Sequence, residues 1–126
     1  MKQVKVYFDG NVLNNGKLDS KGSCSFRLEY GEHSKQKTVE LADGMTNNQA
    51  EYYGLLNGLL AIKPAMRKEV DLTVTGDSKL VISQITRAWE CKEPKLRKLR
   101  DCVLDELGKF HSWNAVWIPR DENKAG

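Results

Sequence analysis

At 126 residues and 14.3 kDa, the chain is long enough for one domain with a single hydrophobic core and too short for two. It is 40% hydrophobic and 29% charged, and it contains no apolar run long enough to span a membrane. From the length and composition we expect one globular domain over residues 1–126 with no membrane contact. The net charge of +3 gives only weak support for a polyanionic partner.

The first strand is predicted at Val4–Phe8, where apolar and polar residues alternate before a fully apolar end. The Asp9-Gly10 pair that follows is typical of a tight turn. Asp9 is therefore expected at the carboxyl end of this strand.

Two further strands are predicted before the first helix. Turn-forming residues at 14–16 and 21–22 indicate a loop, and residues 23–30 then alternate strictly between the two faces of a strand. Residues 31–34 predict a hairpin connection into a third strand at 35–41. The three strands are expected to form an antiparallel meander.

The first helix begins at a capping box. The Thr46 hydroxyl can accept the Gln49 backbone N–H while the Gln49 side chain accepts the Thr46 N–H, so a helix is predicted over Asn47–Lys63, closed by Pro64. Small residues recur along one face of this helix and favour close approach of another backbone. They are Ala50, Gly54, Gly58 and Ala61. Glu51 lies one turn inside the helix, near this face.

The second half of the sequence alternates strands with helices. A β-branched strand is predicted at Val70–Thr75, which places Asp77 just beyond its carboxyl end. The spacing of apolar residues predicts helices over Ser78–Ala88 and from Pro94 to Gly108. A last strand is predicted at Trp113–Ile118 and is followed by a polar tail.

The resulting order βββαβααβ predicts an α/β fold with a five-stranded mixed sheet flanked by helices. In such sheets, ligands bind beyond the carboxyl ends of the strands. Asp9 and Asp77 are both expected there, on strands that are candidates for direct neighbours.

Three carboxylates, Asp9, Glu51 and Asp77, have no basic residue directly beside them in the sequence. If they converge, their repulsion must be relieved by protonation of one member or by a divalent metal. Oxygen ligands without nearby Cys or His favour Mg²⁺ or Mn²⁺ over Zn²⁺. Two such ions would support phosphodiester hydrolysis, the chemistry of nucleases. Taken alone, Glu51 also fits a solvated charge in the first turn of a helix, where the helix dipole favours it.

Four motifs resemble, in their order and spacing, those of the type 1 ribonuclease H family. They are Phe8-Asp9-Gly10, Thr46-Asn47-Asn48-Gln49-Ala50-Glu51, Thr75-Gly76-Asp77-Ser78 and Pro119-Arg120-Asp121-Glu122-Asn123. The resemblance implies the ribonuclease H-like fold without its final helix. It also implies endonucleolytic cleavage of the RNA strand of RNA–DNA hybrids with two Mg²⁺ ions, for which Mn²⁺ can substitute. Asp9, Glu51 and Asp77 match three of the family's four acidic metal ligands and are the predicted catalytic residues.

The resemblance further assigns substrate contacts around the acidic residues. The turn at 46–49 is similar to the segment with which the family reads 2′-hydroxyls across the minor groove, although its side chains equally suit a helix start. The predicted substrate-contacting residues are Gly10, Asn11, Thr46, Asn47, Asn48, Gln49, Ser78, Lys79 and Arg120.

One departure from the family pattern bears on activity. The family's fourth acidic ligand falls four residues beyond Asn123, one position past Gly126, which ends the sequence. Either the sequence is truncated, which is the simpler explanation, or Asp121 or Glu122 takes its place.

The leading hypothesis is a metal-dependent ribonuclease H. The missing fourth acid keeps open a catalytically impaired module that binds hybrids on the same fold. Another nuclease of the superfamily, or an integrase-like member, would share the acidic residues but would have no use for the turn that reads 2′-hydroxyls.

Basic residues concentrate within Lys92–Arg100, at the start of a predicted helix. Lys95 and Lys98 are predicted to contact the phosphate backbone of the hybrid, which would give a salt-dependent share of the affinity. The same run is also typical of a solvated helix face.

The three cysteines, Cys24, Cys91 and Cys102, are odd in number and lack the spacing of metal ligands. We expect free thiols, as in a reducing compartment. The amino-terminal residues enter a strand without the features of a signal peptide. Together these features predict a cytoplasmic protein, and a monomer is expected.

Overall fold

The computed structural model describes residues 1–13 and 20–126, so the loop predicted at 14–16 lies outside the described residues. The strands are β1 (Lys2–Leu13), β2 (Lys21–Tyr30), β3 (His33–Glu40), β4 (Val70–Gly76) and β5 (Ser112–Trp117). The helices are α1 (Asn47–Leu60), α2 (Lys79–Ile85) and α3 (Pro94–Leu107), with the short 3-10 helices η1 (Pro64–Glu69) and η2 (Arg120–Glu122). None of the described helices is both long enough and apolar enough to cross a membrane.

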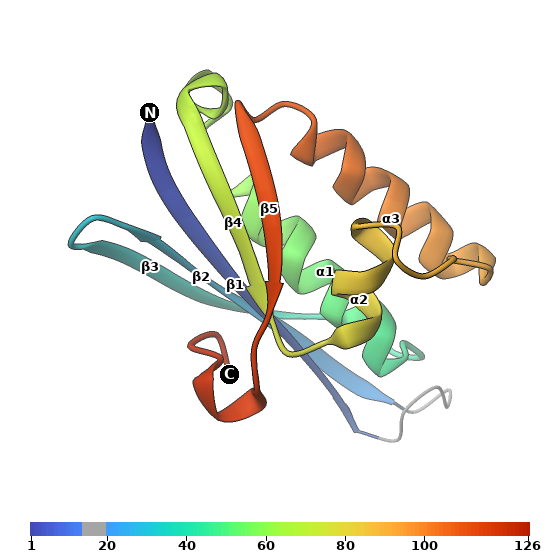
Figure 1. Ribbon diagram of the computed structural model, residues 1–126. Coiled ribbons are helices and arrows are strands. Elements are labelled where there is room, and N and C mark those ends of the chain that lie inside the picture. Colours follow the sequence, from blue (N-terminus) through green and yellow to red (C-terminus); the bar gives the residue numbers. More distant parts are fainter. Residues whose placement is uncertain (14–19) are drawn as a thin grey trace.

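The five strands form one mixed sheet in the order β3-β2-β1-β4-β5. β1, β2 and β3 pair antiparallel, as the predicted meander requires, whereas β4 runs parallel to β1 and to β5. The three α-helices lie on one side of the sheet, and the carboxyl ends of β1, β4 and β5 point toward the same end of the molecule (Figure 1). The predicted fold class and element order are confirmed.

β1 is longer than predicted, and the tight turn predicted at Asp9-Gly10 is wrong. The parallel pairing of β1 with β4 ends where Phe8 faces Gly76, but the antiparallel pairing with β2 continues to Leu13. Asp9 therefore lies within a strand, at the position where one of the two neighbouring strands has ended. A partner strand on one side is enough to keep an Asp-Gly pair extended.

The hydrophobic core lies between the sheet and the helices. Val6 and Phe8 of β1 and Tyr52 and Leu55 of α1 are fully buried in it. Each such side chain contributes about 2 kcal/mol through the removal of apolar surface from water. This packing fixes α1 across β1, the strand that carries Asp9.

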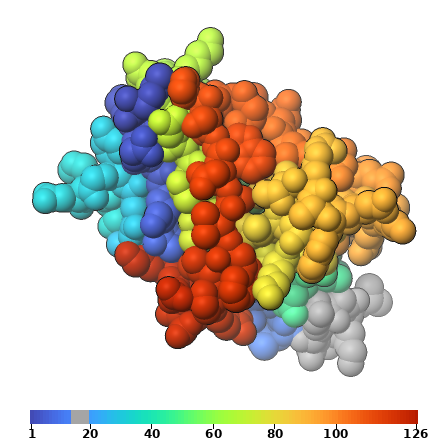
Figure 2. All heavy atoms as spheres, viewed as in Figure 1, coloured from blue at the N-terminus to red at the C-terminus, as the bar shows by residue number. Residues whose placement is uncertain are grey.

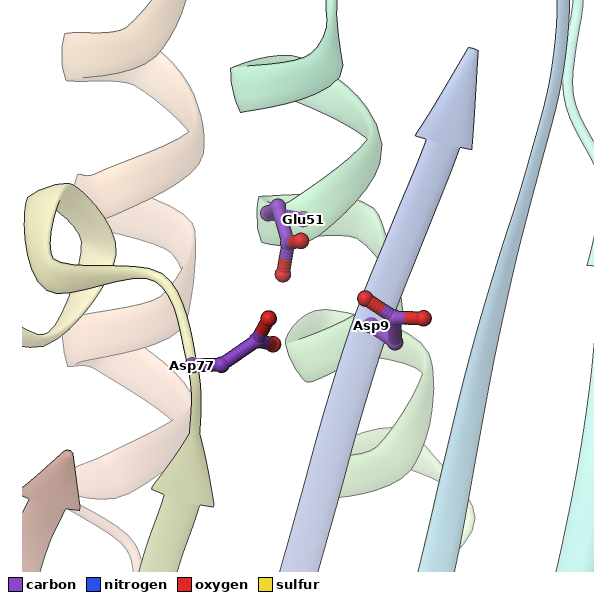
Figure 3. A group of neighbouring side chains, drawn as sticks. All are labelled: Asp9, Glu51 and Asp77. Atoms are coloured by element: carbon purple, nitrogen blue, oxygen red, sulfur yellow. The ribbon is translucent and has the colours of Figure 1, made fainter. Parts of the chain in front are cut away.

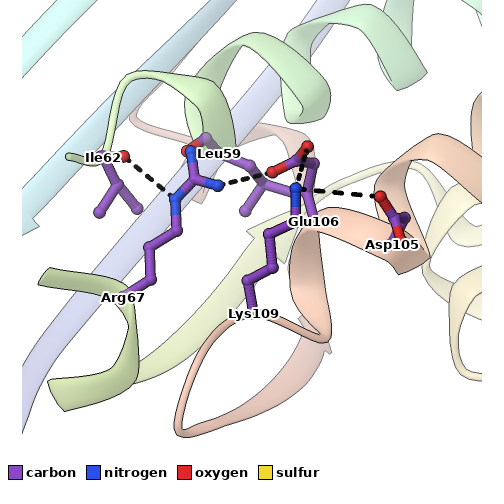
Figure 4. A network of polar contacts seen from close by, with 6 residues as sticks. All are labelled: Leu59, Ile62, Arg67, Asp105, Glu106 and Lys109. Carbon is purple, nitrogen blue, oxygen red and sulfur yellow. Dashed lines mark hydrogen bonds and ion pairs between the residues drawn. The ribbon is translucent and has the colours of Figure 1, made fainter. Parts of the chain in front are cut away.

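The carboxyl end of α1 is held by a buried arginine that the sequence did not point to. Arg67 of η1 is 5% exposed, and it donates to the backbone oxygens of Leu59 and Ile62, each at 3.2 Å. Its Nη1 also contacts Glu106 Oε2 of α3 at 2.6 Å (Figure 4). Because Arg67 takes up these carbonyls and η1 follows, α1 ends at Leu60 and not at the predicted Lys63.

The predicted polar tail folds back onto the sheet. After η2, Asn123 is 8% exposed and Ala125 is 2% exposed. The Ser25 hydroxyl of β2 donates to the Ala125 backbone oxygen at 2.6 Å. In the space-filling view these last residues, coloured red, fill the surface below β5 (Figure 2). Their polar composition resembles a loose tail, but tertiary contacts that no local pattern encodes bury two of them.

β3 forms one edge of the sheet and is the most exposed strand. All its residues are exposed except the partly buried Val39. Lys35 and Lys37 lie on this edge strand opposite Leu28 and Phe26 of β2.

Candidate active site

The structure brings Asp9, Glu51 and Asp77 together at the carboxyl ends of β1 and β4. Each offers one carboxylate oxygen, and these three oxygens all lie within 4.8 Å of one another. Asp9 projects from β1, Glu51 from α1 and Asp77 from the segment after β4, and the three side chains face a common space (Figure 3). The predicted convergence is confirmed, and Glu51 belongs to this acidic cluster rather than being an isolated charge.

Close packing of α1 against β1 places Glu51 beside Asp9. A Cβ added to Gly10 would lie 2.4 Å from the Glu51 backbone nitrogen, and one added to Gly54 would lie 2.7 Å from the Asp9 backbone oxygen. No side chain fits at these two positions. The predicted role of the small-residue face is therefore confirmed at Gly54, and the same face explains how two carboxylates from distant segments come so close.

The acidic cluster leaves negative charge without enough compensation. Asp9 Oδ1 and Glu51 Oε2 are buried, and neither has a hydrogen-bond partner. Burial and the charges of Asp9 and Asp77 raise the pKa of Glu51 to about 9, and burial together with Asp77 also raises the pKa of Asp9. Unpartnered carboxylate oxygens that share one space fit a hard divalent cation.

Asp77 is held by residues from the end of the chain. Asn123 Nδ2 donates to Asp77 Oδ1 at 2.8 Å, and Trp117 Nε1 donates to the Asp77 backbone oxygen at 2.9 Å. Arg120, 79% exposed, has its Nε 3.9 Å from Asp77 Oδ2. Of the three, only Arg120 was predicted to belong to the site. Asn123 ends one of the four motifs noted in the sequence, but no local pattern indicates that Asn123 or Trp117 binds Asp77, which is 46 and 40 residues away from them.

The turn at 46–49 builds the start of α1 as predicted. Thr46 Oγ1 accepts the Gln49 N–H at 3.2 Å, and Gln49 Oε1 accepts the Thr46 N–H at 2.9 Å. Asn47 Oδ1 accepts the Val12 backbone N–H at 3.0 Å and so ties this turn to β1. Asn48 is exposed, and its side chain makes no hydrogen bond with the described residues. Of the four, Asn48 presents its amide most directly to a ligand.

The other predicted substrate contacts surround the acidic cluster with different roles. Ser78 caps α2, because its hydroxyl accepts the Val81 N–H at 3.1 Å. Lys79 is exposed, with its Nζ 4.7 Å from the centre of the Trp117 ring. Gly10 is buried against α1, so the structure shows it in packing, whereas Asn11 is exposed.

A basic surface lies beyond the far end of α2. Lys95 and Lys98 are exposed on the first turns of α3, while Leu96 and Leu99, each directly after one of these lysines, are buried. Neighbouring residues of the chain line a hollow of about 460 Å³, which the sequence did not indicate. Its lining includes Arg87, Trp89, Lys92, Arg97 and Arg100. In the chain, α2, whose seven residues span about 10 Å, lies between Asp77 and the first residue of this lining, Arg87.

Asp121 and Glu122 do not join the acidic cluster. Both are exposed, and both line a separate hollow of about 480 Å³ on the side of the sheet away from the helices, together with Tyr7. The suggestion that one of them replaces the fourth acidic ligand is not supported by this arrangement. Gly126 lies closer, because a Cβ added to it would be 3.3 Å from Asp9 Oδ2.

Comparison with known proteins gives a consistent result. Residues 8–126 match the family described as reverse transcriptase-like. Ribonuclease HI of Halobacterium salinarum is 38% identical over 128 residues, which cover 97% of this chain but only 59% of that protein. The crystal structure of RNase H1 from the same organism has a TM-score of 0.82 at 30% identity, covering 98% of this chain and 91% of that one. LC11-RNase H1 in complex with an RNA/DNA hybrid has a TM-score of 0.83 and covers 96% and 88% of the two chains, and at 20% identity this likeness supports the shared fold alone.

Proposed function

Because this chain belongs to the type 1 ribonuclease H family, we propose that it is a metal-dependent endonuclease that hydrolyses the RNA strand of RNA–DNA hybrids. The observation that carries the proposal is the acidic cluster: one carboxylate oxygen from each of its three residues lies within 4.8 Å of the others, and Asp9 Oδ1 and Glu51 Oε2 are buried without a hydrogen-bond partner. The chain spans 59% of the length of its H. salinarum relative, so the activity is proposed for this domain on its own residues.

Asp9, Glu51 and Asp77 would hold the divalent ions, which we propose to be two Mg²⁺, with Mn²⁺ as a substitute. Bound there, such ions supply Lewis-acid activation of water and stabilisation of the charge that develops on the phosphate and the leaving oxygen. The residues themselves fix three carboxylates on rigid elements before substrate arrives. This preorganisation lowers the reorganisation needed in the transition state.

Selection of a hybrid is proposed to depend on the turn at 46–49. Thr46 and Gln49 use their side chains to hold the turn, which leaves the exposed Asn48 amide to contact a ribose 2′-hydroxyl in the minor groove. The LC11-RNase H1 complex, which has the same fold, contains an RNA/DNA hybrid and is consistent with this substrate class.

The test is a cleavage assay on labelled RNA–DNA hybrid, duplex DNA and duplex RNA, with Mg²⁺, Mn²⁺ or EDTA. Cleavage of the RNA strand of the hybrid is expected with either metal and is expected to stop in EDTA. Asp77→Asn should lower kcat by about 100-fold or more while leaving hybrid binding within a few-fold, since it removes a metal-ligating charge without altering the nucleic-acid surface. Asn48→Ala should reduce the preference for hybrid over duplex DNA.

Two outcomes would overturn the assignment in different ways. Tight hybrid binding without cleavage would support the catalytically impaired module. Equal cleavage of duplex DNA and hybrid would support another nuclease activity on this fold. The cytoplasmic location and the monomeric state remain predictions, and the three cysteines are free.

A further inference from the structure

Asn123 joins the two strands that carry the acidic cluster. The residue is 8% exposed. Nδ2 donates to Asp77 Oδ1 at 2.8 Å and to the Phe8 backbone oxygen at 2.9 Å. Its Oδ1 accepts the Ala125 backbone N–H at 3.1 Å. Both amide hydrogens and the amide oxygen are thus engaged, which fixes the orientation of the amide group.

The amide lies at the end of the pairing between β1 and β4, where it can affect the geometry of the acidic cluster. Phe8 and Gly76 form the last pair between β1 and β4. Asp9 follows Phe8 and Asp77 follows Gly76, so the two ligands diverge from the end of this ladder. Asn123 binds across the opening just where the backbone pairing stops. Its side chain therefore links the two strands at the position where the next pair of backbone hydrogen bonds would be.

The chemistry of an amide suits this place better than that of a cation. A lysine or arginine buried in direct contact with Asp77 would offset the negative charge that a metal ligand must keep, whereas Arg120, which does approach Asp77, is 79% exposed and has its Nε 3.9 Å from Asp77 Oδ2. An amide donates a hydrogen bond to one oxygen, restricts rotation of the carboxylate and leaves its charge in place. Groups that hold a metal ligand in this way have large effects on metal affinity although they do not touch the metal.

We propose that Asn123 is a positioning residue that orients Asp77 for divalent-cation binding. The inference rests on the proposed function, because it assumes that the acidic cluster binds metal. The competing explanation is that Asn123 only anchors the end of the chain. The two differ in their consequences, since a second anchor exists. The Ser25 hydroxyl donates to the Ala125 backbone oxygen at 2.6 Å, whereas among the described residues it is Asn123 that donates to the Asp77 carboxylate.

The experiment compares Asn123→Ala and Asn123→Ser with Ser25→Ala as the matched control. Mn²⁺ binding is measured by calorimetry without nucleic acid, thermal unfolding in EDTA reports whether each variant is folded, and kcat and KM are measured on hybrid. Both Asn123 variants should weaken Mn²⁺ binding by about tenfold or more. They should lower kcat at fixed Mn²⁺ with KM for hybrid little changed, because Asn123 is buried. Ser25→Ala should lower the unfolding temperature but leave Mn²⁺ affinity within about twofold of the parent.

Either of two results would overturn the proposal. One is an Asn123 variant that is folded and binds Mn²⁺ as tightly as the parent. The other is a loss of Mn²⁺ affinity in Ser25→Ala equal to that in the Asn123 variants, which would show that anchoring alone matters. If the parent binds Mn²⁺ but cleaves no hybrid, the proposed function fails while the role of Asn123 is still decided by calorimetry.

Discussion

Glu51 is held where the folded protein retains a proton that the unfolded chain releases. Its pKa is raised from the ordinary 4.5 to about 9, first by burial and then by Asp9 and Asp77. Between these two values the folded state binds more protons than the unfolded state, so stability without metal falls as pH rises from about 4.5 toward 9. The acidic cluster is therefore a destabilising feature at neutral pH until a cation binds.

Glu51→Gln should remove most of this pH dependence. In EDTA at pH 8, the free energy of unfolding of the variant should exceed that of the parent by on the order of 1–3 kcal/mol, with little difference at pH 4. Urea unfolding at several pH values measures it. Glu32→Gln, at an exposed hairpin turn, is the control and should follow the parent. Parallel pH profiles for Glu51→Gln and the parent would contradict the argument.

For single residues, the sequence indicated the three acidic side chains of the site but not the residues that hydrogen-bond to them. Asp9, Glu51 and Asp77 each sit beside a local signal, either an apolar strand or a capping box. Asn123 ends a motif, but that motif does not indicate what its side chain binds, because its partners Phe8 and Asp77 are 115 and 46 residues away. Local periodicity contains no information about bonds of that separation.

Among the elements, the pairing of α1 with β1 determines the geometry of the acidic cluster. The two backbones meet without intervening side chains at Gly10 and Gly54. Any group inserted there must push α1 away from β1, and Glu51 would move away from Asp9 with it. Stability and metal affinity are therefore expected to change together at this contact.

Gly54→Ala tests this coupling, because its Cβ would lie 2.7 Å from the Asp9 backbone oxygen. We expect the free energy of unfolding to fall by about 1–3 kcal/mol, as for overpacked cores, and Mn²⁺ affinity to fall as well. Gly108→Ala is the control. Gly108 has φ −63 at the end of α3, and an added Cβ would make only ordinary contacts at 3.5 Å. That variant should be neutral or slightly more stable. Unchanged metal affinity in a destabilised Gly54→Ala would refute the coupling.

Where elements begin could be predicted better than where they end. The capping box fixed the start of α1, and Pro94 and Gly108 bounded α3 correctly. The end of α1 depends on Arg67, and the length of β1 depends on its pairing with β2. These are tertiary contacts, and a pattern read along one segment cannot register them.

At the scale of the whole molecule, the acidic cluster and the basic surface beyond α2 are two separate regions of opposite charge. A duplex that reaches both would place its cleaved strand at the acids and its phosphates near the exposed Lys95 and Lys98. The basic surface should then govern how tightly the substrate is held, and the acidic cluster how fast it is cleaved.

Replacing Lys95 and Lys98 together by Ala should raise KM for hybrid with kcat little altered. Each lost phosphate contact lowers the slope of log affinity against log salt by about 0.9, so the double variant should lose about 2 from that slope. Lys63 directly precedes η1, Lys68 lies within it, and both are exposed. Replacing both by Ala therefore gives a control with the same change of charge. Equal effects from the two pairs would mean that net charge alone matters.

The exposed edge strand β3 bears on how the protein behaves at high concentration. Unpaired backbone groups along a sheet edge can recruit a strand from another copy, which is a common start of ordered aggregation. Lys35 and Lys37 place like charges on this edge, so two β3 strands brought together would repel. At 0.1 M salt, repulsion between exposed charges that are more than about 10 Å apart is largely screened. Concentrated stocks should therefore stay dispersed longest in dilute buffer, and light scattering that does not change across a salt series would show that the lysines have no such effect.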